Sequence, residues 1–233
     1  MPLFLKNRQT DLVELMDRDD CDQHKLENTY RQFYRINGIL SQWRRIYTTQ
    51  LRPLMQDRNR EFTLLDIGFG GGDIPFSLAK WAQNDGLNLK ITAIELDERA
   101  LDFVSDLEPH PKIEFKHCSS TQLVLENRTF DFVISNHVLH HLDTDTFSKF
   151  LDEAISLAGK KVIFNDIERS DIGYALFNIF SRLLFRNSFI TQDGLTSVKR
   201  SFTFSELKHV IPEKWNTDRL FPFRLILSYT KDA

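Results

Sequence analysis

The stretch Leu64-Leu65-Asp66-Ile67-Gly68-Phe69-Gly70-Gly71-Gly72-Asp73 decides the fold class of this chain. It continues an apolar run that starts at Phe62, and a short apolar run closed by glycines predicts a buried strand. The residues from Pro75 to Trp81, with proline in the first turn, predict the helix that follows. In an open α/β sheet, ligands bind beyond the carboxyl ends of the strands, so this glycine-rich turn is a candidate binding site.

Strands and helices alternate downstream of this turn. Apolar runs predict strands at residues 89–94, 112–117, 130–135 and 161–164, with helices at 98–107 and 144–157 between them. Residues 215–221 and 223–229, on either side of Pro222, predict an antiparallel C-terminal hairpin. The predicted fold class is therefore α/β, a Rossmann-like doubly wound, mostly parallel seven-stranded sheet that ends in that hairpin.

Helical segments flank this sheet in the sequence. Residues 24–52 have helical spacing of apolar side chains, and Gly38 is a predicted break between two helices. The segment 171–185 predicts a helix with a broad apolar face, followed by a polar loop at 187–199 and a short helix capped by Ser205. We therefore expect an N-terminal helical extension at residues 1–60, a main domain at 61–233, and a helical cap or lid at about 168–204.

Composition narrows the functional classes. The 233 residues are 41% hydrophobic and 27% charged, which is typical of a globular protein. A net charge of −3 argues against a dedicated nucleic-acid binder, and Cys21 and Cys118 are too few for a disulfide framework. No signal peptide and no run of eighteen apolar residues is present, so we expect a cytoplasmic protein with no stable membrane insertion. The 20 phenylalanines suit either a core or a pocket for an apolar ligand.

The residues around the turn indicate the ligand. Asp73-Ile74-Pro75 differs from the Gly-Lys-Ser/Thr of a phosphate loop, and Asp73 replaces the last glycine of the dinucleotide pattern. An acid there would repel a pyrophosphate, whereas Asp66 and Asp73 suit a cationic ligand. Glu95 ends the second predicted strand, where an acid can accept both hydroxyls of a ribose. S-adenosylmethionine combines a ribose with a positively charged sulfonium and therefore fits this site.

Residues 62–164 resemble the class I S-adenosylmethionine-dependent methyltransferases. The stretch from Asp66 to Gly72 matches their acid-x-Gly-x-Gly-x-Gly signature, and Glu95 matches their ribose-binding acid. The block Phe130-Asp131-Phe132-Val133-Ile134-Ser135-Asn136-His137-Val138-Leu139-His140-His141-Leu142 resembles the ubiquinone/menaquinone-type, small-molecule branch. One feature departs from the family, since His117-Cys118-Ser119-Ser120 stands where relatives often carry an adenine-binding aspartate. A hydroxyl or a backbone carbonyl would have to replace that carboxylate.

The resemblance implies a set of cofactor-binding residues at the carboxyl edge of the sheet. They are Asp66, Gly68, Phe69, Gly70, Gly72, Glu95, Leu96, Cys118, Ser119, Asn136 and His137.

The sequence indicates the residues for catalysis and for acceptor binding less directly than those for the cofactor. His137 or His140 has the ordinary pKa of a general base for a phenolic proton. The spacing of His137, His140 and His141 with Asp143 would allow a metal site, but the resemblance implies a structural role, so we expect no metal. On the acceptor side we expect side chains from the loop and helix after the fifth strand: Asp166, Arg169, Phe177 and Phe180.

The predicted function is in-line methyl transfer from S-adenosylmethionine to a small, lipophilic or aromatic acceptor. Two alternatives remain open, a nucleotide-dependent oxidoreductase and a noncatalytic S-adenosylmethionine-binding protein. A nucleic-acid acceptor is disfavoured, because Asn136-His137-Val138-Leu139 stands in place of an Asn-Pro-Pro-aromatic block. The acceptor atom and the oligomeric state are left open.

Overall fold

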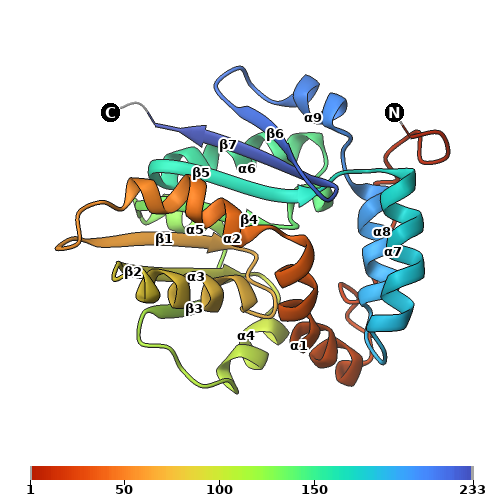
Figure 1. Ribbon diagram of the computed structural model, residues 1–233, viewed down its shortest axis with the longest axis horizontal. Helices are drawn as coiled ribbons and strands as arrows, with labels where there is room; N and C mark the ends of the chain where they lie inside the picture. Colours follow the sequence, from red (N-terminus) through yellow and green to blue (C-terminus); the bar gives the residue numbers. More distant parts are fainter. Residues whose placement is uncertain (1, 232–233) are drawn as a thin grey trace.

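A seven-stranded sheet with helices on both faces forms the centre of the computed structural model, which describes residues 2–231 (Figure 1). The strand order is β3-β2-β1-β4-β5-β7-β6. Strands β1 to β5 are parallel, and β7 inserts antiparallel between β5 and β6. The predicted mostly parallel sheet with its antiparallel C-terminal hairpin is confirmed. The strands are β1 (Glu61–Ile67), β2 (Asn88–Glu95), β3 (Ile113–His117), β4 (Phe130–Asn136), β5 (Ala158–Ile167), β6 (Asn216–Leu220) and β7 (Arg224–Thr230).

The register of the parallel strands brings their carboxyl ends to one edge. Ile67 pairs with Ile94 of β2 and with Ser135 of β4. Asn136 in turn pairs with Asn165 of β5. The glycine turn, Glu95, Asn136 and Asp166 therefore lie along one edge of the sheet, as the order of a doubly wound sheet requires.

Two apolar clusters cover the two faces of the sheet. On one face, α5 (Ser120–Leu125), α6 (Thr144–Leu157) and α9 (Phe204–Val210) bury their apolar sides, with Trp215 stacked on Phe164. On the other face, α3 (Asp73–Asn84) packs with the segment 43–55. A third cluster joins α1 (Gln23–Leu40) to α4 (Glu98–Ser105) above the glycine turn. The short helix α5 was not predicted from the sequence.

The N-terminal helices differ in detail from the prediction. Helix α1 continues through Gly38 and is followed by α2 (Trp43–Ile46), the π-helical η1 (Tyr47–Leu51) and the 3₁₀ turn η2 (Arg52–Leu54). The break falls at Gln42, which has a left-handed φ of 58°, and the predicted break at Gly38 is wrong. Nothing lies within 4 Å of a Cβ built on Gly38, so packing does not require a glycine there.

The segment after β5 holds one helix more than expected. Helices α7 (Asp171–Leu184) and α8 (Ile190–Arg200) lie side by side, so the predicted polar loop at 187–199 is wrong. The phenyl ring of Phe177 packs on Gly194, where a Cβ would come within 2.4 Å of it. Helix α9 is capped by Thr203, whose side chain and Glu206 form a capping box, rather than by Ser205. Among residues 2–231, no helix is long and apolar enough to cross a membrane.

Candidate functional site

The turn between β1 and α3 is built on left-handed glycines. Gly68, Gly70 and Gly72 have φ angles of 81°, 51° and 77°, a region that side chains rarely adopt. A Cβ on Gly68 would also lie 2.7 Å from a methyl group of Val138. Both backbone conformation and space therefore require glycine at this position.

Glu95 is held against this turn by backbone amides. Its carboxylate accepts hydrogen bonds from the amides of Gly70, at 3.1 Å, and Leu96, at 2.8 Å. Burial raises the pKa of Glu95, and these amides oppose the rise because they stabilise the charged form. The acid expected for the ribose thus lies beside the turn with a fixed orientation.

Two further acids lie beneath the turn. Asp66 is 1% exposed, and one of its carboxylate oxygens has no hydrogen-bond partner within the described residues. Burial, followed by the charges of Asp73 and Glu95, raises the pKa of Asp66 well above its ordinary value. Burial also raises the pKa of Asp73 to about 6, against a hydrogen bond of 3.0 Å from Asn37. An unpartnered buried carboxylate and a cradle of glycines fit a ligand with a cationic group, as S-adenosylmethionine has.

The remaining residues expected to bind the cofactor lie in different surroundings. The Cys118 amide donates to the Glu95 carbonyl at 3.2 Å, which brings residue 118 to the same edge. The Ser119 hydroxyl caps α5 by accepting from the amide of Gln122. Phe69 is buried edge-on against Phe115, with ring centroids 4.8 Å apart. Leu96 is largely exposed. Their predicted contacts with the cofactor stay predictions.

The N-terminal helices form one wall of the site. The ring of Phe33 lies 3.5 Å from the position of a Cβ on Gly70. Further along the edge, the Trp43 indole donates a 3.0 Å hydrogen bond to the Asn136 side chain. Asn136 therefore has its carbonyl oxygen fixed from outside the sheet, by a residue that the sequence indicated only as an apolar position of the N-terminal helices.

His137 has a left-handed φ of 64° and contacts Arg224 of β7. A guanidinium only donates, so Nε2 of His137 accepts that hydrogen bond and the ring proton is on Nδ1. Burial and the charge of Arg224 hold the pKa of His137 well below its ordinary value. The ring is therefore neutral with its acceptor nitrogen engaged, and the predicted role of His137 as a base finds no support in this geometry.

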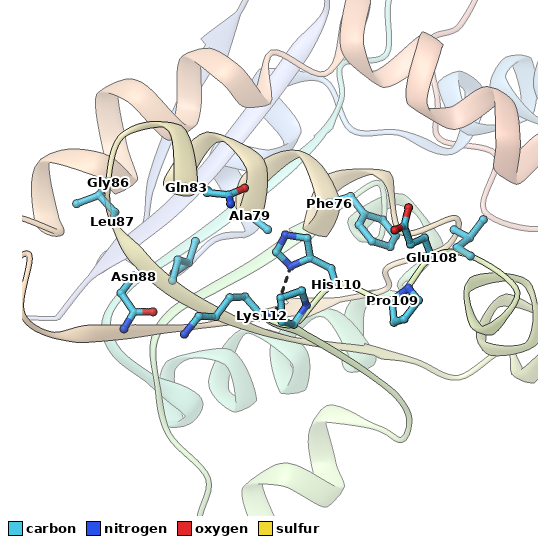
Figure 2. A pocket seen from close by; sticks show the side chains of 13 residues that line it. Phe76, Ala79, Gln83, Gly86, Leu87, Asn88, Glu108, Pro109, His110 and Lys112 are labelled. Carbon is cyan, nitrogen blue, oxygen red and sulfur yellow. Dashed lines mark hydrogen bonds between the residues drawn. The ribbon is translucent and has the colours of Figure 1, made fainter.

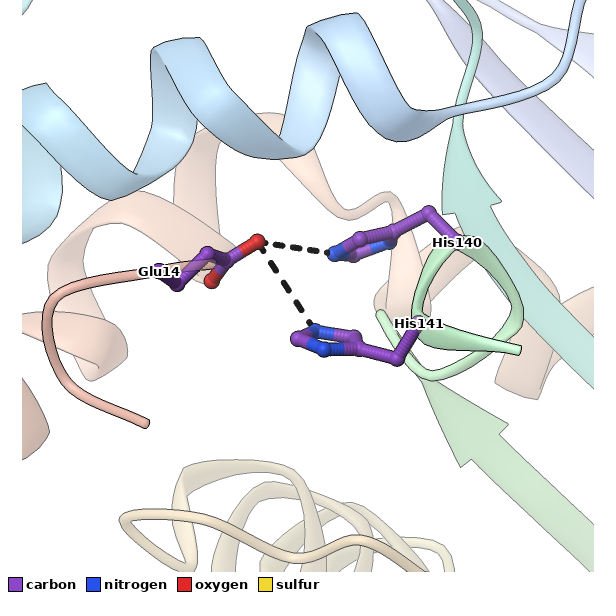
Figure 3. A group of neighbouring side chains, drawn as sticks. All are labelled: Glu14, His140 and His141. Atoms are coloured by element: carbon purple, nitrogen blue, oxygen red, sulfur yellow. Dashed lines mark hydrogen bonds and ion pairs between the residues drawn. The ribbon is translucent and has the colours of Figure 1, made fainter. Parts of the chain in front are cut away.

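His140 is buried between two carboxylates. Its Nδ1 lies 2.7 Å from Asp166 and its Nε2 lies 3.3 Å from Glu14, as Figure 3 shows for the Glu14 side. Burial alone would lower the pKa of His140, but Asp166 and Glu14 raise it to about 9. An imidazolium that donates to both carboxylates cannot accept a further proton. The predicted role of His140 as a base therefore finds no support either.

His141 joins the same cluster. Its Nε2 lies 3.8 Å from Glu14 and its Nδ1 lies 3.4 Å from Asp17. Glu14, His140 and His141 place one atom each within 4.8 Å of one another, close enough for a metal ion. The same Glu14 oxygen also accepts from the Ser197 hydroxyl at 2.7 Å, so hydrogen bonds and ion pairs account for this arrangement. The expectation of no metal stays a prediction.

The residues expected on the acceptor side are not gathered around one cavity. Asp166 uses both oxygens on His140 and on the Ile167 amide. Arg169 is 2% exposed and binds the carbonyls of Leu5, Lys6 and Ser201 and the carboxylate of Glu206, so a substrate contact finds no support. Phe177 packs on α8, whereas Phe180 is exposed. Arg169 instead holds the N-terminal segment.

A surface pocket of about 890 Å³ lies along the outer side of α3, away from these residues (Figure 2). It is lined by Phe76, Gln83, the start of β2 and the loop 107–112. In that loop, Nδ1 of His110 accepts from the Lys112 amide at 3.2 Å. None of the predicted cofactor or acceptor residues lines this pocket.

Comparison with known proteins places this geometry in a family. Residues 64–160 match the family model described as a methyltransferase domain. The chain contains a class I S-adenosylmethionine-dependent methyltransferase domain. The matched residues of this methyltransferase domain span the glycine turn, Glu95 and the block from Asn136 to His141. The predicted family and the predicted cofactor are confirmed at the level of the domain.

Curated relatives are distant. A tRNA N(3)-methylcytidine methyltransferase from Schizosaccharomyces pombe is 26% identical over 78% of this chain. A ubiquinone/menaquinone biosynthesis C-methyltransferase from Rickettsia bellii is 25% identical over 54% of it. The chain spans 62% and 48% of the length of these two proteins. Because the first of them acts on tRNA, the expected exclusion of nucleic acid is not supported.

Solved structures share the fold of the methyltransferase domain. The plantazolicin methyltransferase BpumL, in complex with a triazolic desmethylPZN analog and S-adenosylhomocysteine, superposes with a TM-score of 0.62 at 10% identity, covering 91% of this chain and 98% of that one. A carbon methyltransferase of CurJ superposes with a TM-score of 0.63 at 10% identity, covering 94% of this chain and 63% of that one.

Proposed function

We propose that this chain transfers a methyl group from S-adenosylmethionine to a small, lipophilic or aromatic acceptor. The observation that carries the proposal is the left-handed glycine turn with Glu95 bonded to its Gly70 amide. The matching family model supports the class of reaction. The bound cofactor supplies the methyl group and the electrophilic sulfonium.

The residues at the turn have separate roles in this proposal. Glu95, oriented by the turn, accepts hydrogen bonds from the two ribose hydroxyls. The unpartnered oxygen of Asp66 faces the cationic end of the ligand, where a positive charge stabilises its ionised form. The turn from Gly68 to Gly72 lets the ligand approach the backbone without interference from a Cβ.

The acceptor class rests on two further features. Phe33 comes from α1 to the glycine turn, and Trp43 is buried behind Asn136, so aromatic side chains from the N-terminal helices lie beside this edge of the sheet. The relative named for ubiquinone/menaquinone biosynthesis supports a small acceptor, whereas the relative named for tRNA supports the competing class. The N-terminal extension at 1–60 and the cap at 168–204 belong to this proposal as the segments that enclose the acceptor.

The state of the two histidines restricts the acceptor chemically. His137 is neutral with its acceptor nitrogen engaged, and His140 is protonated between two carboxylates. Because neither ring accepts a proton in this state, we propose an acceptor that arrives ionised or that needs no deprotonation, such as an acidic phenol or enol. The residues of the chain align it and exclude water.

The experiment is a labelled-methyl transfer assay. The protein is incubated with methyl-labelled S-adenosylmethionine and either a panel of acidic phenols and quinols or total tRNA. We expect label in the organic extract and none in the tRNA. Label only in the tRNA would overturn the acceptor class. A protein that binds S-adenosylmethionine without turnover, or that binds NAD instead, would overturn the reaction.

A further inference from the structure

Helix α7 is oriented with its apolar side toward solvent. The side chains that it buries best are the small ones of Gly173 and Ser181. Large apolar side chains on the opposite side, together with two from the N-terminal segment, are each between 43% and 88% exposed. We call this set the α7 face: Leu3, Phe4, Ile172, Leu176, Ile179, Phe180, Leu183 and Leu184. An exposed apolar surface of this extent marks an interaction site.

The N-terminal segment is fixed beside the start of α7. The backbone amides of Leu3, Phe4 and Leu5 donate to the carboxylate of Asp171. The two exposed side chains of residues 3 and 4 therefore extend the apolar surface beyond the helix. Figure 1 shows α7 at the margin of the molecule, beyond the carboxyl ends of the strands. A helix of 14 residues is about 21 Å long, enough for a substantial contact with a surface.

Charge indicates which partner fits the α7 face. The sequence from Ile172 to Asn187 and the sequence from Pro2 to Thr10 contain no aspartate or glutamate. Asp171, at the junction of the two segments, is already bonded to three amides. Lys6, Arg182 and Arg186 are exposed around the face, although the whole chain has a net charge of −3. The surroundings of the face are thus locally cationic.

A second copy of the chain fits this pattern poorly. A two-fold interface places the same surface on both partners, so the cations around one α7 face would meet the cations around the other with no acid of these segments between them. An anionic lipid surface matches both the exposed apolar side chains and the cations around them. Lipid headgroups attract the lysine and arginines, and the upper acyl region accepts the apolar side chains.

We propose that the α7 face docks this protein on the surface of an anionic membrane, with the helix lying in the plane of the interface. This mode requires no membrane-spanning helix. The proposal concerns the solvent-facing side of α7, whereas the proposed function needs only that the cap encloses the acceptor, so membrane binding and methyl transfer can fail separately. Docking of this kind would place an enzyme for lipophilic acceptors at the lipid bilayer, where such molecules dissolve.

The test is cosedimentation of the full chain with vesicles, without cofactor or acceptor. One set of vesicles combines phosphatidylcholine with phosphatidylglycerol, and the other is phosphatidylcholine alone. We expect binding to the anionic vesicles, weaker binding to the neutral ones, and a loss of binding at high salt. The double variant Ile179→Asp/Leu183→Asp should lower the partition coefficient by about tenfold or more, since two apolar side chains no longer enter the interface.

The control is Leu125→Asp, which places a charge on a leucine of α5 that is 77% exposed, and it should bind as the unaltered protein does. Circular dichroism checks that each variant is folded. If the double variant does not fold, Arg182→Gln and Lys6→Gln replace it, each with an expected loss of several-fold on anionic vesicles only. Absence of vesicle binding, or equal binding by the α7 and Leu125 variants, would overturn the proposal. So would self-association in solution that the double variant abolishes, with no binding to vesicles.

Discussion

The backbone carbonyl of Tyr30 lies 2.8 Å from the position that a Cβ on Gly71 would take. Helix α1 therefore rests directly on the glycine turn, with main chain against main chain. The N-terminal helix and the turn are one structural unit, although forty residues of sequence separate them. A substitution at Gly71 should therefore disturb both helix α1 and the turn.

Gly71→Ala should displace α1 from the turn. The new methyl group meets backbone, which cannot rotate away, so we expect a destabilisation of about 1–3 kcal/mol and weaker cofactor binding. Urea unfolding and calorimetric titration with S-adenosylhomocysteine measure the two effects. The control is Gly38→Ala, where a Cβ has free space inside α1 and should stabilise the protein by about 0.5–1 kcal/mol. Equal behaviour of the two variants would show that α1 does not rest on the turn.

Glu95→Ala should abolish most of the cofactor affinity. The substitution removes the acceptor of two charge-assisted hydrogen bonds to ribose, each worth on the order of 1.5–3 kcal/mol. Calorimetry should therefore show an affinity lower by about a hundredfold or more. Glu98→Ala, an exposed acid in the first turn of α4, serves as the control and should bind normally. Unchanged affinity in the Glu95 variant would remove this residue from the ribose site.

His140 should make stability depend on alkaline pH. Its pKa rises from 6.5 to about 9 in the folded protein, so its contribution is fully present below pH 6.5 and is lost as pH rises through about 9. The shift corresponds to at most roughly 3 kcal/mol. Urea unfolding across this range measures the loss.

The variant His140→Gln should remove the dependence, whereas His209→Gln, at an exposed position of α9, should keep it. A His140 variant that still loses the same stability between these pH values would assign the effect to another group.

Arg169→Ala should destabilise the protein by about 3 kcal/mol or more. The change leaves the carbonyls of Leu5, Lys6 and Ser201 without their donor and removes an ion pair in which Arg169 is fully buried and Glu206 is 38% exposed. Arg219→Ala breaks an exposed pair with Glu168 and should cost about 1 kcal/mol or less. Comparable losses in the two variants would argue against a structural role of Arg169. Cofactor affinity measured in the same samples separates this role from a contact with ligand.

The sheet could be predicted because the strands are marked by patterns in their own local sequence. Apolar runs such as 130–135 and the glycines after β1 need no knowledge of distant residues. The same holds for Asp66 and Glu95, which stand at strand ends. Helix α8 was missed because its sequence is polar and it is held from outside, with Asp193 accepting from the amides of Leu15 and Met16.

The partners of the histidines could not be predicted for a related reason. Glu14 and His140 are 126 residues apart, and nothing near either residue indicates the other. The same is true of Trp43 with Asn136, and of Arg224 with His137. The chemical state of a titratable group depends on such long-range neighbours. Sequence could therefore name the histidines as candidates for a base but could not give their protonation.

The contacts of Arg169 impose an order on biosynthesis. The carbonyls of Leu5 and Lys6 dock on this residue together with Ser201 and Glu206, and the amides of Leu15 and Met16 dock on Asp193. Residues 5, 6, 15 and 16 therefore leave the ribosome well before the residues on which they dock. At about 5–20 residues per second, the interval is on the order of ten seconds or longer. During that time strands β1 to β5 can assemble, but the N-terminal segment lacks its full set of partners, and it is then most accessible to chaperones and proteases.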